Sequence, residues 1–223
     1  IYNNSYLVIS LYLLLGFLID IMTNLTLNLS FSIGTILRGI LFIYLVLGLF
    51  IKYPKKENYY ILGLLGIFSL IFLIFKHTLT DITFLFKYNY VLVLFLFIYN
   101  LYKSEDKKIN RNILTLSLIF YSLSIIIAWL TKSAVNSYDV AKTGTVGWFN
   151  SANEISAIIS IIVPYLFINL EKRINFIEII AIILSLFAAI LIGTRLPIVV
   201  FLICLLYILI KKLIKDIKRK KIN

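Results

Sequence analysis

The run FIEIIAIILSLFAAILI (residues 176–192), followed by GTR (193–195) and LPIVVFLICLLYILI (196–210), decides the fold. As one helix, residues 176–211 would extend about 54 Å, whereas the hydrocarbon core of a bilayer is about 30 Å thick. The chain must therefore reverse direction between Gly193 and Pro197. Glycine commonly ends a helix, and proline favours the first turn of the next one. Arg195 should consequently lie at a membrane face, where it indicates an anion-binding site.

Apolar residues make up 61% of the whole chain. Only helices and closed barrels satisfy their backbone hydrogen bonds in lipid, and these runs lack the apolar–polar alternation of barrel strands. We therefore predict an all-α, polytopic transmembrane helix bundle that forms a single domain over residues 1–223. The spans, about eight in number, are predicted near residues 5–22, 33–51, 59–75, 83–102, 112–130, 153–170, 176–193 and 196–211.

The formal net charge of +12 would favour nucleic-acid binding in a soluble protein. Here most of the 22 basic residues lie on alternate connections between the spans, so membrane topology explains them and we expect no nucleic-acid partner. The positive-inside rule places these connections and both termini in the cytoplasm. The connections are 52–58, 103–111, 171–175 and the tail from residue 211. The loop 131–152 and the Arg195 turn are then predicted to lie outside.

Several kinds of catalytic site find no support in the sequence. The chain has one histidine and one cysteine, so no metal-ligand spacing exists and we expect neither a metal nor another cofactor. It also lacks a G-x-S-x-G elbow and a phosphate-binding loop. The catalytic residues therefore stay unassigned at this stage.

The outer loop ends in GTVGWFNSANE (144–154), which leads directly into a span. Its glycines allow a tight turn, and either Ser151 or Asn153 is suited to cap the following helix. Glu154 stands at the start of an apolar span, where an acidic group is costly and is usually paired. One interpretation is a well-capped interfacial helix, with Trp148 and Phe149 as aromatic anchors at the membrane surface.

The interpretation as a capped interfacial helix does not account for the small and polar residues that recur along one face of this span. Such a stripe favours close approach to other helices. The stripe consists of Asn153, Ser156, Ala157 and Ser160.

Arg195 is the natural partner or neighbour of Glu154, because both are predicted on the outer face. A guanidinium binds phosphate through two parallel hydrogen bonds, and the start of a helix adds a positive end. Arg38, near the outer end of the second span, is a further candidate for the same electropositive patch. The alternative for both arginines is that they reach lipid phosphates at the membrane surface.

Two motifs together resemble the O-antigen ligase and polymerase superfamily. GTVGWFNSANEISA (144–157) resembles its G-x-F-x-N-x-N region, and GTRLP (193–197) resembles its S/T-R motif, with Leu196-Pro197 in place of small residues. The resemblance implies an enzyme that transfers glycan from an undecaprenyl-pyrophosphate donor onto an acceptor, outside the membrane, in cell-surface polysaccharide biosynthesis. It also implies that Arg195 contacts the donor pyrophosphate and that Asn153 and Glu154 shape the same pocket. The expected partners are this donor and membrane lipids.

The residues leave several alternatives open. The superfamily has a large outer loop after a later span, so we expect this chain to be the N-terminal portion of a longer protein. Heavy use of Ile, Leu, Asn, Lys and Tyr is typical of an AT-rich bacterial genome, and we expect the protein to lie in the cytoplasmic membrane of a bacterium.

The alternative functions are a transporter or flippase-like carrier for a lipid-linked or anionic solute, and a non-catalytic membrane subunit. A carrier should show repeated halves or helices interrupted near the midplane, and the sequence shows neither.

Overall fold

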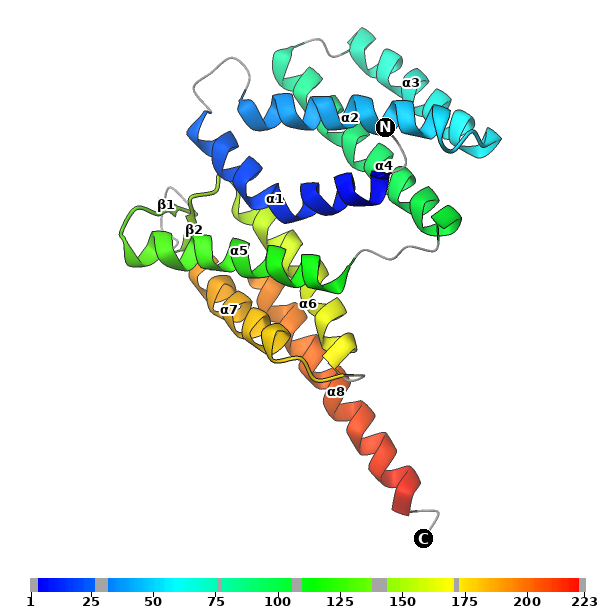
Figure 1. The fold of residues 1–223 in the computed structure, drawn as a ribbon. Helices are drawn as coiled ribbons and strands as arrows, with labels where there is room; N and C mark the ends of the chain where they lie inside the picture. Colours follow the sequence, from blue (N-terminus) through cyan, green and yellow to red (C-terminus); the bar gives the residue numbers. More distant parts are fainter. Residues whose placement is uncertain are drawn as a thin grey trace. The chain divides into compact units, whose positions relative to one another are not determined.

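The computed structural model describes residues 4–26, 32–75, 78–105, 110–137, 144–170 and 173–220. In these residues the chain forms eight α-helices and one antiparallel ribbon of two short strands (Figure 1). The helices are α1 (Ser5–Leu25), α2 (Ile33–Ile51), α3 (Lys56–Phe75), α4 (Leu79–Glu105), α5 (Arg111–Leu130), α6 (Ala152–Leu170), α7 (Phe176–Ile192) and α8 (Arg195–Lys220). The strands are β1 (Val135–Asn136) and β2 (Thr145–Gly147), a ribbon that the sequence analysis did not predict.

Seven of the described helices are long and apolar enough to cross a membrane. The remaining helix, α7, has 17 apolar-rich residues and would extend about 25 Å, close to the lower limit for a span. The prediction of an all-α, multi-pass membrane protein with about eight spans is therefore confirmed. Which face of the membrane each connection occupies stays a prediction.

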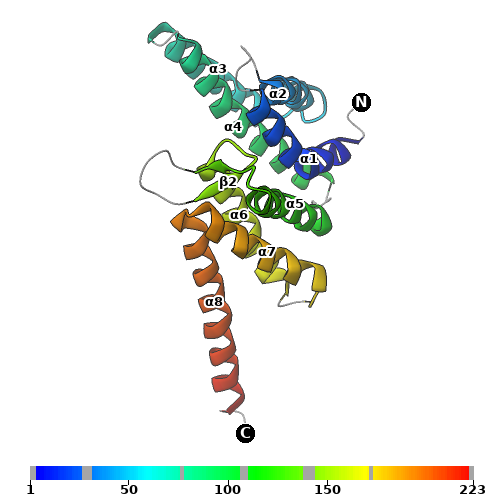
Figure 2. The same cartoon turned by 90° about the vertical axis from the view of Figure 1, so that its left-hand side faces the viewer.

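Two helices are longer than the apolar runs that predicted them. The helix α4 begins four residues before the predicted span at 83 and ends at Glu105, and α8 continues to Lys220 instead of ending near 211. Lysine and glutamate are good helix formers, so a helix need not stop where its apolar run stops. The C-terminal part of α8 projects past the ends of α6 and α7 (Figure 2).

The chain divides into two compact units, and the division falls within α1. Unit 1 comprises Ile1–Leu11 and Asn28–Ile109, and unit 2 comprises Tyr12–Leu27 and Asn110–Asn223. The predicted single domain over residues 1–223 stays a prediction.

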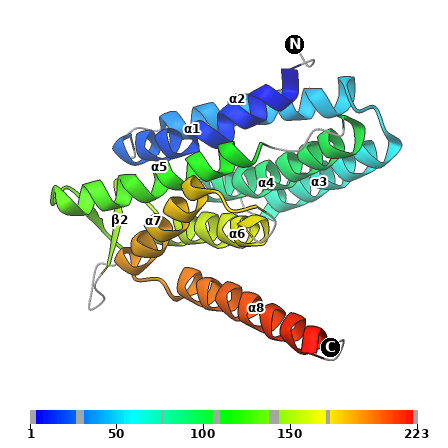
Figure 3. The same cartoon turned by 60° about the horizontal axis from the view of Figure 1, so that its bottom comes forward.

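In unit 1, α2, α3 and α4 pack side by side (Figure 3). A buried polar network joins the start of α3 to the C-terminal part of α4. The Nζ of Lys55 donates to Asn100 Oδ1 at 3.1 Å, and Asn100 Nδ2 donates to Asn58 Oδ1 at 3.0 Å. Because both asparagines are almost fully buried, their mutual hydrogen bond offsets the cost of taking two amides out of water.

The core of unit 2 is formed by α5, α6, α7 and α8, with β2 packed against three of them. The helix α7 turns small side chains toward this core, which lets α5 and α6 approach its backbone closely. These buried small residues are Ala181, Ser185, Ala188 and Ala189. The large side chains that fill the centre are Leu118, Ile125, Phe149, Ile155, Ile159, Leu166 and Ile192.

Candidate functional site

The predicted reversal of the chain between α7 and α8 is confirmed. Gly193 has a φ of 75°, the left-handed conformation that glycine adopts without strain. Its N–H donates to the carbonyl groups of Ala189 and Ile190 at 3.3 and 3.2 Å, which closes α7. The helix α8 begins two residues later at Arg195, with Pro197 in its first turn, where a missing N–H costs nothing.

The start of α6 is capped by Ser151. Its Oγ accepts a hydrogen bond from the backbone N–H of Glu154 at 3.3 Å. Of the two predicted caps, Ser151 is therefore correct, and Asn153 instead lies inside the first helical turn. Both Asn153 and Glu154 are exposed to the surroundings.

A hydrogen bond between two hydroxyl groups joins the beginnings of α6 and α8. The Oγ of Ser156 and the Oγ1 of Thr194 lie 2.5 Å apart, and both residues are buried. Ser156 is in the second turn of α6, and Thr194 directly precedes Arg195. The two positive helix ends therefore lie together at one end of unit 2, with the exposed Arg195 beside them.

The predicted small-residue stripe of α6 is only partly directed inward. Ser156 is buried, as is the Oγ of Ser160, whereas Asn153 and Ala157 are exposed. Among the described residues, no partner is found for the Ser160 hydroxyl.

The loop between α5 and α6 is attached to these helices by polar contacts. Ser137 Oγ donates to the carbonyl oxygen of Ile192 at 2.9 Å, at the end of α7. Gly144 lies so close to the same carbonyl that a Cβ there would be 2.4 Å from the oxygen. Gly147 has a φ of 68°, as its predicted role in a tight turn requires.

The two loop aromatics do not share one role. Phe149 is 1% exposed, and its ring lies 5.3 Å from that of Tyr121 in the core. The interpretation of Phe149 as a membrane-surface anchor is therefore wrong, because the ribbon folds this side chain inward. Trp148 is partly exposed, and its indole N–H donates to Ser133 Oγ at 2.8 Å.

The structure thus brings together three of the four predicted site residues. Asn153, Glu154 and Arg195 lie at the same end of unit 2, within one or two turns of the Ser156–Thr194 hydrogen bond. Among the described residues, no ion pair joins Arg195 to Glu154. Arg38 belongs to unit 1, where it is half-buried in the second turn of α2.

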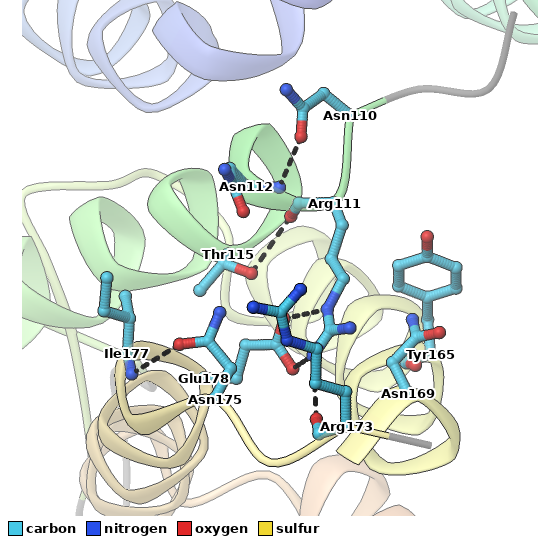
Figure 4. Close-up of polar contacts among 10 residues, drawn as sticks. All are labelled: Asn110, Arg111, Asn112, Thr115, Tyr165, Asn169, Arg173, Asn175, Ile177 and Glu178. Atoms are coloured by element: carbon cyan, nitrogen blue, oxygen red, sulfur yellow. Dashed lines mark hydrogen bonds and ion pairs between the residues drawn. The ribbon is translucent and has the colours of Figure 1, made fainter. Parts of the chain in front are cut away.

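A second polar cluster, which the sequence analysis missed, lies at the opposite end of unit 2, at the starts of α5 and α7. Figure 4 shows its residues. Glu178, in the first turn of α7, is fully buried and accepts two hydrogen bonds from the guanidinium of Arg111, at the start of α5. The Nη2 of Arg111 also donates to the carbonyl oxygen of Arg173 at 3.4 Å. An acid inside an apolar span was the available signal, because such groups are usually paired.

This second cluster borders a pocket of about 440 Å³. Its lining is mostly polar and comprises Arg111, Asn112, Arg173, Ile174, Asn175 and Phe176. Two clusters that contain an arginine therefore lie at opposite ends of unit 2.

Comparison with known families gives a match over nearly the whole chain. Residues 2–223 match the family described as "O-antigen ligase like membrane protein". No curated protein and no solved structure matches the chain significantly. The match agrees with the multi-pass helical architecture and with the motifs at the starts of α6 and α8. The chain belongs to the family of O-antigen ligase like membrane proteins.

Proposed function

We propose that this protein transfers glycan from an undecaprenyl-pyrophosphate-linked donor to an acceptor at the outer face of a bacterial cytoplasmic membrane. It would act as a ligase or polymerase in the biosynthesis of a cell-surface polysaccharide. Membership of the O-antigen ligase like family supports the reaction class. The observation that carries the site is the hydrogen bond between Ser156 and Thr194, which holds two helix N-termini beside Arg195.

The proposed reaction needs a site that stabilises negative charge on the leaving group. When the bond between the sugar and the pyrophosphate breaks, the lipid pyrophosphate leaves as an anion. The acceptor oxygen forms the new glycosidic bond, and its proton passes to the leaving pyrophosphate or to water. Arg195 is always charged and suits two parallel hydrogen bonds to a phosphate. The starts of α6 and α8 add partial positive charge at the same place. Stabilisation of this kind is commonly the largest contribution to catalysis.

Asn153 and Glu154 are proposed to shape the pocket from the first turn of α6. Both are exposed, so their side chains are accessible to a donor or an acceptor. The carboxylate of Glu154 suits hydrogen bonds from sugar hydroxyl groups, and the amide of Asn153 both donates and accepts. Arg38 lies in α2 of unit 1, and its role in binding an anion stays a prediction from the sequence.

The test compares Arg195→Ala and Arg195→Lys in the whole protein, reconstituted in vesicles with a lipid-pyrophosphate-linked oligosaccharide. We expect Arg195→Ala to slow glycan transfer by about a hundredfold or more, because removal of one such donor typically has that effect. Arg195→Lys should be nearly as damaging, since lysine retains the charge but loses the two-pronged geometry. Lys132→Gln, an exposed change in the predicted outer loop, is the matched control and should leave the rate unchanged.

Other outcomes would contradict the proposal in distinct ways. Full activity of Arg195→Lys would refute the two parallel hydrogen bonds to the phosphate, because a point charge alone would then be sufficient. Normal transfer by Arg195→Ala would exclude Arg195 from the site. Movement of labelled donor across the bilayer without any transfer of glycan would identify a carrier instead.

A further inference from the structure

The pocket between the starts of α5 and α7 is rich in hydrogen-bond donors. Arg111 and Arg173 line it together with Asn112 and Asn175 (Figure 4). The Oδ1 of Asn175 accepts the N–H of Ile177 at 3.1 Å and so caps α7. Its Nδ2 has no acceptor within the described part of the chain. The capping amide therefore leaves a donor available for a ligand.

The charges of the described residues around this pocket do not cancel. Glu178 is fully buried and neutralises Arg111 through two hydrogen bonds. In the parts of the chain that the structure describes, Arg173 has no carboxylate partner, and its side chain is exposed. Among the described residues, the guanidinium of Arg173 therefore has no acidic partner beside this polar pocket of about 440 Å³. A phosphate group matches such a donor set, because arginine binds its oxygens in pairs.

Two large apolar side chains border the same pocket. Ile174 is 82% exposed and Phe176 is 74% exposed. Exposed apolar side chains beside a polar pocket suit an apolar ligand or the acyl region of a bilayer. The predicted topology places this end of unit 2 at the cytoplasmic surface, where the leaflet contains anionic lipids. The polar lining of the pocket and the apolar side chains beside it together fit a molecule with a phosphate headgroup and hydrocarbon chains.

We propose that this pocket binds the phosphate headgroup of one anionic phospholipid of the inner leaflet. Arg173 contacts the phosphate, Asn175 donates a further hydrogen bond, and the acyl chains lie against Ile174 and Phe176. The bound lipid fills the pocket between the starts of α5 and α7 and so stabilises unit 2. This proposal is independent of the glycan transfer proposed for the opposite end of the unit.

The test titrates the full chain in detergent with short-chain phosphatidylglycerol and follows the midpoint of thermal unfolding. A ligand that binds only the folded state raises this midpoint in a saturable way. We expect phosphatidylglycerol to do so and phosphatidylcholine to do so far less. Arg173→Gln should raise the half-saturating concentration about tenfold, the effect of losing one charge-assisted contact. Lys56→Gln removes the same charge at an exposed position on the same predicted membrane face and should change nothing.

Two further measurements separate a lipid from a free anion. Phe176→Ser, at an exposed position, should weaken the response to phosphatidylglycerol. Inorganic phosphate at the same concentrations should stabilise the protein little. If inorganic phosphate or phosphatidylcholine stabilises the protein as much as phosphatidylglycerol does, the proposal that the ligand is an anionic phospholipid headgroup is refuted. Equal responses of Arg173→Gln and Lys56→Gln would exclude the pocket.

Discussion

Removal of Arg111 should destabilise the protein more than any surface change, because it leaves the carboxylate of Glu178 buried without a counter-ion. Glu178 is 0% exposed, and Arg111 supplies both of its hydrogen bonds. Breaking a buried ion pair from one side typically costs about 3–5 kcal/mol. The side chain of Arg111 is 25% exposed, so solvent already screens part of the interaction. We therefore expect Arg111→Leu to lower the free energy of unfolding by about 3 kcal/mol, the lower end of that range.

The reciprocal change should be milder. In Glu178→Leu the released guanidinium of Arg111 can turn to water or lipid phosphates, so the loss should be about 1–2 kcal/mol. The double variant Arg111→Leu/Glu178→Leu removes both charges, and we expect it to recover most of the wild-type stability. Replacement of a buried pair by apolar residues is often neutral or favourable.

The assay is reversible unfolding of the full chain in mixed micelles, with the two single variants and the double variant forming a cycle. A coupling energy of about 3 kcal/mol or more between the two sites would support the buried pair. If the effects of the single changes simply add, the two residues do not interact and the reasoning is refuted. A loss below about 0.5 kcal/mol for Arg111→Leu, a typical surface value, would refute the burial of the carboxylate.

Two further changes probe the other end of unit 2. Gly147→Ala should lower the free energy of unfolding by more than about 1 kcal/mol, because φ is positive there and the new Cβ would lie 2.7 Å from the Cα of Ile125. Gly63→Ala, where a Cβ meets nothing within 4 Å, is the control in the same unfolding measurement and should cause no loss. Thr194→Val should cost about 1 kcal/mol by removing the hydrogen bond to Ser156 and, on the proposed function, should raise the KM for the lipid-linked donor. An unchanged KM in steady-state kinetics would separate that hydrogen bond from donor binding.

Local sequence features were sufficient for the helices and for the turn that carries Arg195. An apolar run of the right length must cross the bilayer as a helix, since its backbone has no other partner in lipid. Gly193 and Pro197 limit the conformations of their own residues, so they mark the end of α7 and the start of α8 without help from the rest of the chain. The ends of α4 and α8 were predicted less well, because charged residues extend a helix beyond its apolar run.

Contacts between segments that are distant in the chain could not be predicted from local sequence features. Glu154 was expected to be paired because it is an acid at the start of a span, yet it is exposed. Among the described residues, Glu178 is the acid that is both buried and paired, and its partner Arg111 lies 67 residues away in the chain. The sequence predicted Phe149 as a surface anchor, but the ribbon places its ring against that of Tyr121. The hydrophobicity of a segment predicts that it lies in the membrane. Because hydrophobicity is similar on all sides of these helices, it does not predict which other helix each one packs against. Which faces meet is decided by the fit of side chains across helices, as between α5 and the small residues of α7, and this fit exists only in the folded molecule.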